Sequence, residues 1–172
     1  MNNIFGACRD GNVNALLSAI KRGEDVNKAG NSLAPLMHAS NTSSTGHLQC
    51  MIILINSGAD VNGRDSDLNT ALQHAASVDN VVGINLLLDN GAKIDSVNNI
   101  NMTPLMVTCY DNYTNSARVL LERGANLTFP NEEGNTCLHI ATMNTNIDMI
   151  KLFFQYGADD AVENVCNFNL YM

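Results

Sequence analysis

The feature that most constrains this chain is a pattern that returns every 33 residues. The same short motif begins at Thr70, Thr103 and Thr136, and each time a small residue or proline and then leucine follow it. A Gly-Ala pair recurs with the same spacing, at Gly91 and Gly124 among other positions. A fixed period of this length predicts a stack of nearly identical supersecondary units.

We expect each 33-residue repeat to form two helices followed by a protruding connection. The threonine hydroxyls can cap the first helix, and Pro104 suits the first helical position, where a missing N–H costs nothing. Apolar residues then recur at helical spacing, and a glycine ends the second helix. Between the two helices of each repeat we expect a turn, at Gly46, Asp79, Asn112 and Thr145. The second repeat carries three extra residues in the segment 41–45, between its two helices.

These motifs resemble the ankyrin repeat. The segments that carry the resemblance are Thr103-Pro104-Leu105, Thr136–Ala141 and Gly58–Asn62. The resemblance implies an all-α ankyrin-repeat solenoid of helix-turn-helix units joined by protruding β-hairpins. It implies one ankyrin-repeat domain over residues 2–163, followed by a cap or tail over 164–172. The domain divides into a partial repeat at 2–28 and repeats at 29–64, 65–97, 98–130 and 131–163.

Charge and composition narrow the class of partner and the compartment. The net charge of −8 over 172 residues disfavours nucleic acid and anionic membrane surfaces as partners. No apolar stretch is long enough to cross a bilayer, and the N-terminus lacks the charged and apolar regions of a signal peptide. We therefore expect an intracellular protein, cytoplasmic or also nuclear. The five cysteines form no CxxC pair, which disfavours structural zinc.

Residues with catalytic or metal-binding chemistry are better explained as structural. We expect His38 and His74 to stack at equivalent places in successive repeats, too far apart for one zinc ion. The resemblance gives His139 a structural hydrogen bond to the backbone. No phosphate loop or Ser/His/Asp arrangement is present. We therefore predict that the chain is not an enzyme and needs no cofactor or metal. Leu68 stands where a turn favours glycine, so we expect a distorted fingertip there.

The variable surface of such a stack is the concave face of fingertips and first helices, where the resemblance places the partner-binding residues. Its centre is unusually apolar, and acidic residues at its rim favour a partner segment that carries Lys or Arg. The predicted partner-binding residues are Leu33, Asp67, Asn69, Val78, Asn99, Ile100, Met102, Tyr110, Asp111, Phe129, Glu132, Glu133 and Met143.

The resemblance implies a monomeric, non-enzymatic module that binds another protein. The alternative is an inhibitory or targeting subunit of an enzyme or transcription factor, of the IκB-like or kinase-inhibitor-like kind. The chain also resembles the stand-alone ankyrin-repeat arrays that viruses and intracellular parasites carry. In addition, Asn62 follows Leu54 by eight residues, which resembles the substrates of asparaginyl hydroxylation.

Overall fold

The chain folds into two compact units, residues 1–93 and residues 94–172. The computed structural model describes residues 3–28 and 33–158, so the predicted tail 164–172 lies outside the described residues. The first unit contains α1 (Ile4–Arg9), α2 (Val13–Lys21), α3 (Pro35–Ser40), α4 (Thr45–Asn56), α5 (Ala71–Ala76) and α6 (Val81–Asp89). The second contains α7 (Pro104–Tyr110), α8 (Thr114–Glu122), α9 (Cys137–Met143) and α10 (Ile147–Gln155).

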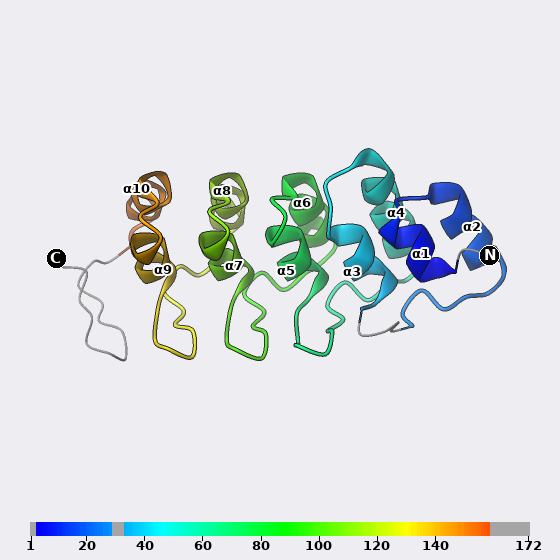
Figure 1. The fold of residues 1–172 in the computed structure, drawn as a ribbon, viewed down its shortest axis with the longest axis horizontal. Helices are drawn as coiled ribbons and strands as arrows, with labels where there is room; N and C mark the ends of the chain where they lie inside the picture. The colour runs from blue at the N-terminus through cyan, green and yellow to red at the C-terminus, as the bar shows by residue number, and fades with distance from the viewer. Residues whose placement is uncertain (1–2, 29–32, 159–172) are drawn as a thin grey trace. The chain divides into compact units, whose positions relative to one another are not determined.

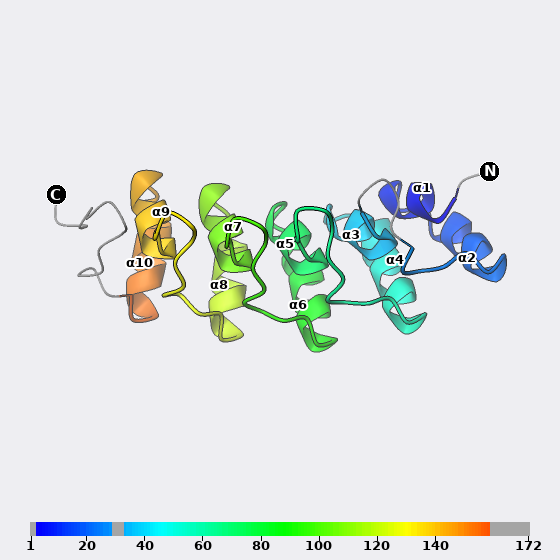
Figure 2. The ribbon, with the colours of Figure 1, turned by 90° about the horizontal axis from the view of Figure 1, so that it is seen from below.

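Within the second unit, two helix pairs lie side by side. The inner helices α7 and α9 are neighbours, as are the outer helices α8 and α10 (Figures 1 and 2). Leu105 and Leu138 of the inner helices and Leu120 and Phe153 of the outer helices are buried. Each fully buried side chain of this size contributes about 1.5–3 kcal/mol, so the core stabilises the stacking of the two pairs.

The predicted threonine cap is present at the start of α7, and a bond from the threonine amide to a side chain marks the starts of α9 and α5. Thr103 accepts a hydrogen bond from the amide of Met106, and Pro104 occupies the first helical position. At α9 the amide of Thr136 donates to Nδ1 of His139, which confirms the expected structural role of this histidine. In α5 the amide of Thr70 donates to Oε1 of Gln73, so a glutamine provides the same backbone bond without an imidazole.

The connections protrude as loops that are closed by a turn. Over residues 3–28 and 33–158 the fold is helical and contains no β-strand. The expected all-α solenoid is therefore confirmed, whereas the expected hairpins are turn-closed loops. In Figure 1 the loops before α7 and α9 extend beyond the inner helices, away from α8 and α10. The helices within 3–28 and 33–158 are too short to cross a membrane.

The three extra residues of the second repeat lengthen a helix, and the predicted turn at Gly46 is wrong. Helix α4 has 12 residues whereas α6 has 9, and Gly46 lies within the first turn of α4. The turn residues Asp79, Asn112 and Thr145 do adopt the left-handed conformation, with φ of 51°, 61° and 53°. Gly46 instead lies against Gly11, where an added Cβ would be 2.5 Å from the carbonyl oxygen.

Candidate functional site

Each unit carries candidate site residues in tip loops, and each tip loop is organised by one polar side chain at its start. We use "tip loop" for residues 65–69, 98–102 and 131–135. In the second unit, Oδ1 of Asn98 accepts from the amides of Ile100 (3.2 Å) and Met102 (2.9 Å). Oδ1 of Asn131 accepts in the same way from Glu133 (3.0 Å) and Asn135 (2.9 Å). These bonds hold the tips in one conformation and turn the intervening side chains outward.

The tip loop of the first unit uses an aspartate for the same purpose. Oδ1 of Asp65 accepts from the amides of Asp67 (2.9 Å) and Asn69 (2.8 Å), and Oδ2 lies 2.9 Å from Nε2 of His74. Burial raises the pKa of Asp65, but the hydrogen bonds from Asn69, His74 and Asp67 outweigh it and leave this pKa below its ordinary value. The carboxylate is therefore the form that the fold stabilises.

The expected distortion at Leu68 is not observed. Leu68 adopts the left-handed conformation with φ 63°, as Asn101 (55°) and Gly134 (76°) do at the equivalent positions. Its amide donates to the carbonyl of Asp65 at 3.1 Å, which matches the bond from Gly134 to Asn131 at 3.0 Å. A branched residue is costly in this conformation, and we infer that the hydrogen bonds to the Asp65 carboxylate offset that cost.

Four predicted residues of the second unit are large apolar side chains in contact with solvent. Ile100 is 47% exposed, Tyr110 45%, Phe129 39% and Met143 66%. Ile100 belongs to a tip loop and Phe129 to the connection before the next tip, while Tyr110 ends α7 and Met143 ends α9. Such side chains cost free energy in water unless a partner covers them.

Tyr110 is oriented by the tip loop that follows it. Its hydroxyl oxygen accepts from Nδ2 of Asn131 at 3.4 Å. Burial, together with the nearby Glu133 carboxylate, raises the pKa of Tyr110. The hydroxyl is thus neutral at physiological pH, and the ring stays available for apolar contact.

The other predicted partner-binding residues are exposed or half-buried. Asn99, Asp111, Glu132 and Glu133 of the second unit are exposed, whereas Met102 is half-buried. In the first unit Asp67 is exposed, and Leu33, Asn69 and Val78 are half-buried. Because these two groups belong to different compact units, one continuous surface through both stays a prediction.

Sequence reasoning missed three features of the surface. It did not identify the organising side chains Asp65, Asn98 and Asn131, although they too are 33 residues apart. It placed no apolar contact residues on the outer helices, yet Ile147 and Phe154 of α10 are 61% and 48% exposed. It also missed a groove between α8 and α10. The 33-residue period was the available signal for the first.

The four cysteines within residues 3–28 and 33–158 have environments that suppress thiol chemistry. Cys8, Cys50, Cys109 and Cys137 are all buried. Burial, with a smaller contribution from Cys50, raises the pKa of Cys8 to about 12, and burial also raises the pKa of Cys109. A thiol with so high a pKa is a poor nucleophile at neutral pH. The described residues contain no group of three or more side chains that could hold a metal ion.

Asn62 uses both ends of its side chain to bind the following repeat. Nδ2 donates to the carbonyl of Gly91 at 2.9 Å, and Oδ1 accepts from the amide of Lys93 at 2.8 Å. Asn27 makes the equivalent pair of bonds to Gly58 and Asp60. Asn62 therefore has a structural role, and its hydroxylation stays a prediction.

Comparison with known proteins agrees with the repeated geometry. A family model described as ankyrin repeats (3 copies) matches residues 4–98 and 83–164. The chain belongs to the ankyrin-repeat family. Ankyrin repeats are protein-interaction modules that are generally non-enzymatic, so the exposed tip loops lie on a scaffold suited to binding a protein.

Several curated ankyrin-repeat relatives are viral. The chain is 34% identical over 146 residues to a putative ankyrin repeat protein, FPV031, of fowlpox virus, covering 80% of this chain and 42% of that protein. It is 30% identical over 132 residues to ankyrin repeat protein OPG189 of variola virus, covering 75% and 23%. It is also 30% identical over 122 residues to the mouse B-cell lymphoma 3 protein homolog, covering 70% and 27%. The chain thus spans less than half the length of each of these relatives.

Proposed function

We propose that this ankyrin-repeat chain is an intracellular, monomeric module that binds a partner protein and has no catalytic activity of its own. The observation that carries the proposal is the set of four exposed apolar side chains of the second unit: Ile100, Tyr110, Phe129 and Met143. Aromatic residues and methionine are enriched at the centres of protein interfaces. These side chains would supply most of the binding energy, because a few buried anchors dominate typical interfaces.

The charges beside these anchors suggest the chemistry of the partner. Asp111, Glu132 and Glu133 are exposed around Tyr110 and the last tip loop. Carboxylates at an interface rim favour an approaching segment that carries Lys or Arg and disfavour nucleic acid. The half-buried Met102 and the tip residue Asn99 would complete the contact surface.

The test combines capture of partners with a quantitative binding measurement. The immobilised chain and its Ile100→Ala/Tyr110→Ala/Met143→Ala variant would be compared on extract of the source cell, and proteins lost with the variant would be identified by mass spectrometry. For such a protein, purified, calorimetry should show affinity reduced by about a hundredfold or more, because several interface anchors are truncated together. The control is Val82→Ala, which removes an exposed apolar side chain from α6 and should leave affinity unchanged.

Two results would contradict the proposal. The proposed surface is wrong if the triple variant retains its affinity while its circular dichroism and melting temperature match the parent. The absence of catalysis is wrong if purified chain converts a substrate with a rate that follows its concentration.

The alternative is an inhibitory or targeting subunit of an enzyme or a transcription factor. The similarity to the mouse B-cell lymphoma 3 protein homolog is the observation that keeps this alternative open. If it holds, the captured proteins include a catalytic subunit or a transcription factor whose activity falls, or whose location changes, when this chain is added. A partner that keeps both its activity and its location would favour simple bridging.

A further inference from the structure

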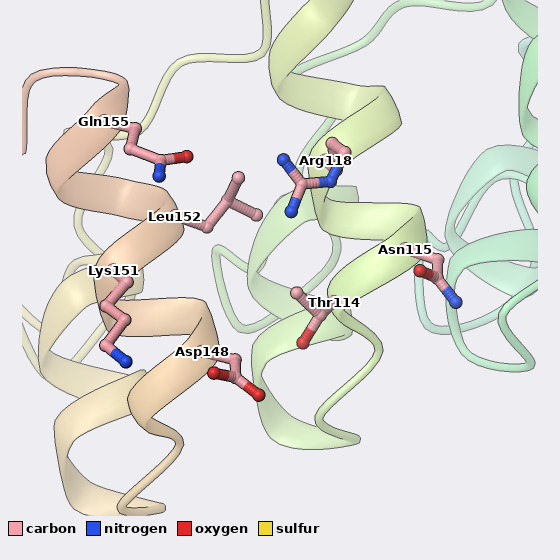
Figure 3. A pocket seen from close by; sticks show the side chains of 7 residues that line it. All are labelled: Thr114, Asn115, Arg118, Asp148, Lys151, Leu152 and Gln155. Carbon is pink, nitrogen blue, oxygen red and sulfur yellow. The ribbon is translucent and has the colours of Figure 1, made fainter.

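The outer helices of the second unit form a groove on a different set of residues from the tip loops. The groove has a volume of about 410 Å³ and lies between α8 and α10 (Figure 3). This volume falls within the range of pockets that hold small ligands, about 300–1,000 Å³. It is lined by Thr114, Asn115, Arg118, Asp148, Lys151, Leu152 and Gln155.

Two cations line the groove because they occupy the same position of consecutive repeats. Arg118 and Lys151 are 33 residues apart, so they project from equivalent places on neighbouring helices. The same position holds Ile52 in α4 and Asn85 in α6. The pair of cations is therefore specific to the second unit. In Figure 3 the guanidinium of Arg118 is directed from α8 toward Leu152 on α10.

These cations are unusual for their surroundings. Residues 94–172 contain nine Asp or Glu and three Lys or Arg, which gives a formal charge of −6 (3 − 9). Two of those three cations line this one groove. Both are exposed, and neither makes an ion pair with any residue in 3–28 or 33–158. Asp148 is the only carboxylate among the lining residues.

We propose that the groove between α8 and α10 binds an acidic segment of a second partner protein through Arg118 and Lys151. The planar guanidinium can hold a carboxylate with two parallel hydrogen bonds, and the ammonium of Lys151 supplies a second positive charge on the α10 side, for another carboxylate of the same segment. The hydroxyl of Thr114 and the amides of Asn115 and Gln155 are further donors around the groove. The buried Leu152 gives it an apolar wall, against which the methylenes of a Glu side chain can pack.

The charge preference of this groove is opposite to that of the tip loops. Glu132, Glu133 and Asp111 favour a basic partner, whereas Arg118 and Lys151 favour an acidic one. The second unit thereby offers two separate sites with opposite charge selectivity, which suits a module that bridges two proteins. The groove proposal does not depend on the tip-loop proposal, because the two involve no common residue.

The test is a titration of the ¹⁵N-labelled full chain followed by nuclear magnetic resonance. The probe is a capped hexapeptide of alternating Glu and Gly, and its Gln-Gly counterpart is the control peptide. We expect saturable shifts of the amide signals of Thr114, Asn115, Arg118 and Lys151 with the first peptide only. These shifts should weaken as salt is raised, because exposed ion pairs are screened.

Three variants make the prediction specific. Arg118→Gln/Lys151→Gln should weaken peptide binding by about fivefold or more, the combined effect of two exposed ion pairs. Asp148→Asn should strengthen binding by about twofold, because it removes a repelling carboxylate. Arg123→Gln, which changes the one cation of residues 94–172 outside the groove, is the matched control and should leave binding within the error.

The outcomes separate the proposal from its competitors. Equal affinity in the parent and the double variant, or shifts confined to other residues, would overturn it. Shifts at the groove with inorganic phosphate but not with the Glu-Gly peptide would assign the site to phosphate and overturn the acidic segment. Because the substituted residues are exposed, the variants should keep the parent spectrum elsewhere.

Discussion

Replacement of Asp65 offers the most direct test of how the tip loops are held. Asp65→Ala removes acceptors for four hydrogen bonds, from the amides of Asp67 and Asn69, from Nδ2 of Asn69 at 3.3 Å and from His74. A hydrogen bond to a charged group contributes about 1.5–3 kcal/mol. The four do not add, because the freed groups lie near the surface and regain water. We therefore expect the free energy of unfolding to fall by about 2–4 kcal/mol.

The other repeats supply the matched comparison. Asn98 and Asn131 hold their tip loops with an amide oxygen, so Asp65→Asn should keep the bonds to the two backbone amides and weaken the contact with His74. The expected loss is about 1 kcal/mol. Asn98→Ala removes two neutral hydrogen bonds and should cost about 1–2 kcal/mol.

The stabilisation that the Asp65 carboxylate contributes should depend on pH in one direction. The pKa of Asp65 is lower in the folded protein than its ordinary value of 3.8. The stabilisation is therefore fully present above the unfolded pKa and is lost as the pH falls through the folded pKa. The difference in stability between the parent and Asp65→Asn should stay constant above the unfolded pKa and shrink at lower pH.

The assay is urea unfolding followed by far-ultraviolet circular dichroism, at neutral pH and at a series of acidic values. Amide hydrogen exchange at Asp67 and Asn69 reports the tip loop itself, which matters because repeat stacks can unfold in stages. Unfolding free energies for Asp65→Ala and Asp65→Asn that agree within 0.5 kcal/mol (about the error of such comparisons) would refute the reasoning. So would a difference that grows as the pH falls.

Two further predictions follow from close packing and burial. Gly46→Ala should destabilise the protein by about 1–3 kcal/mol, because its Cβ would lie 2.5 Å from the carbonyl oxygen of Gly11. Gly6→Ala, whose Cβ would lie 3.4 Å from its nearest neighbour, should instead stabilise α1 by up to about 1 kcal/mol. Urea unfolding of both variants checks the sign of each change in stability. Equal losses of stability in the two variants would contradict the packing argument. In a Cys166→Ser background the four buried thiols should not react with Ellman's reagent at pH 8 in the native protein, since burial raises the pKa of Cys8 to about 12. All four should react in guanidinium chloride, and rapid reaction of the folded protein would show that the thiols are accessible.

Most of the fold was predictable because it depends on local chemistry repeated along the chain. Threonine caps, Pro104 and the closing glycines each act within a few residues, so their spacing indicates where helices begin and end. The turn at Gly46 was predicted wrongly because the same three extra residues can enlarge either a turn or a helix. In the folded chain Gly46 lies in the helix and against Gly11, which is 35 residues earlier in the chain (46 − 11).

The surface was predictable only in part. Register along the repeat indicated that Ile100, Tyr110, Phe129 and Met143 face solvent, and they do. The same register contained Arg118 and Lys151, but their significance depends on what surrounds them. A cation on a helix is ordinary until neighbouring helices show that no carboxylate pairs with it.

The sequence by itself determined the family, the period and the positions of the helices apart from the start of α4, because these follow from patterns that act within one repeat. Tertiary structure decided which polar groups are satisfied. It showed that Asn62 binds the next repeat with both ends of its side-chain amide, and that Asp65 is a buried carboxylate that holds a tip loop. It also showed that Arg118 and Lys151 line one groove and form no ion pair with the described residues. The physical reason is that hydrogen bonds and ion pairs depend on distances of a few ångströms between residues far apart in the chain, and only the packed helices set those distances.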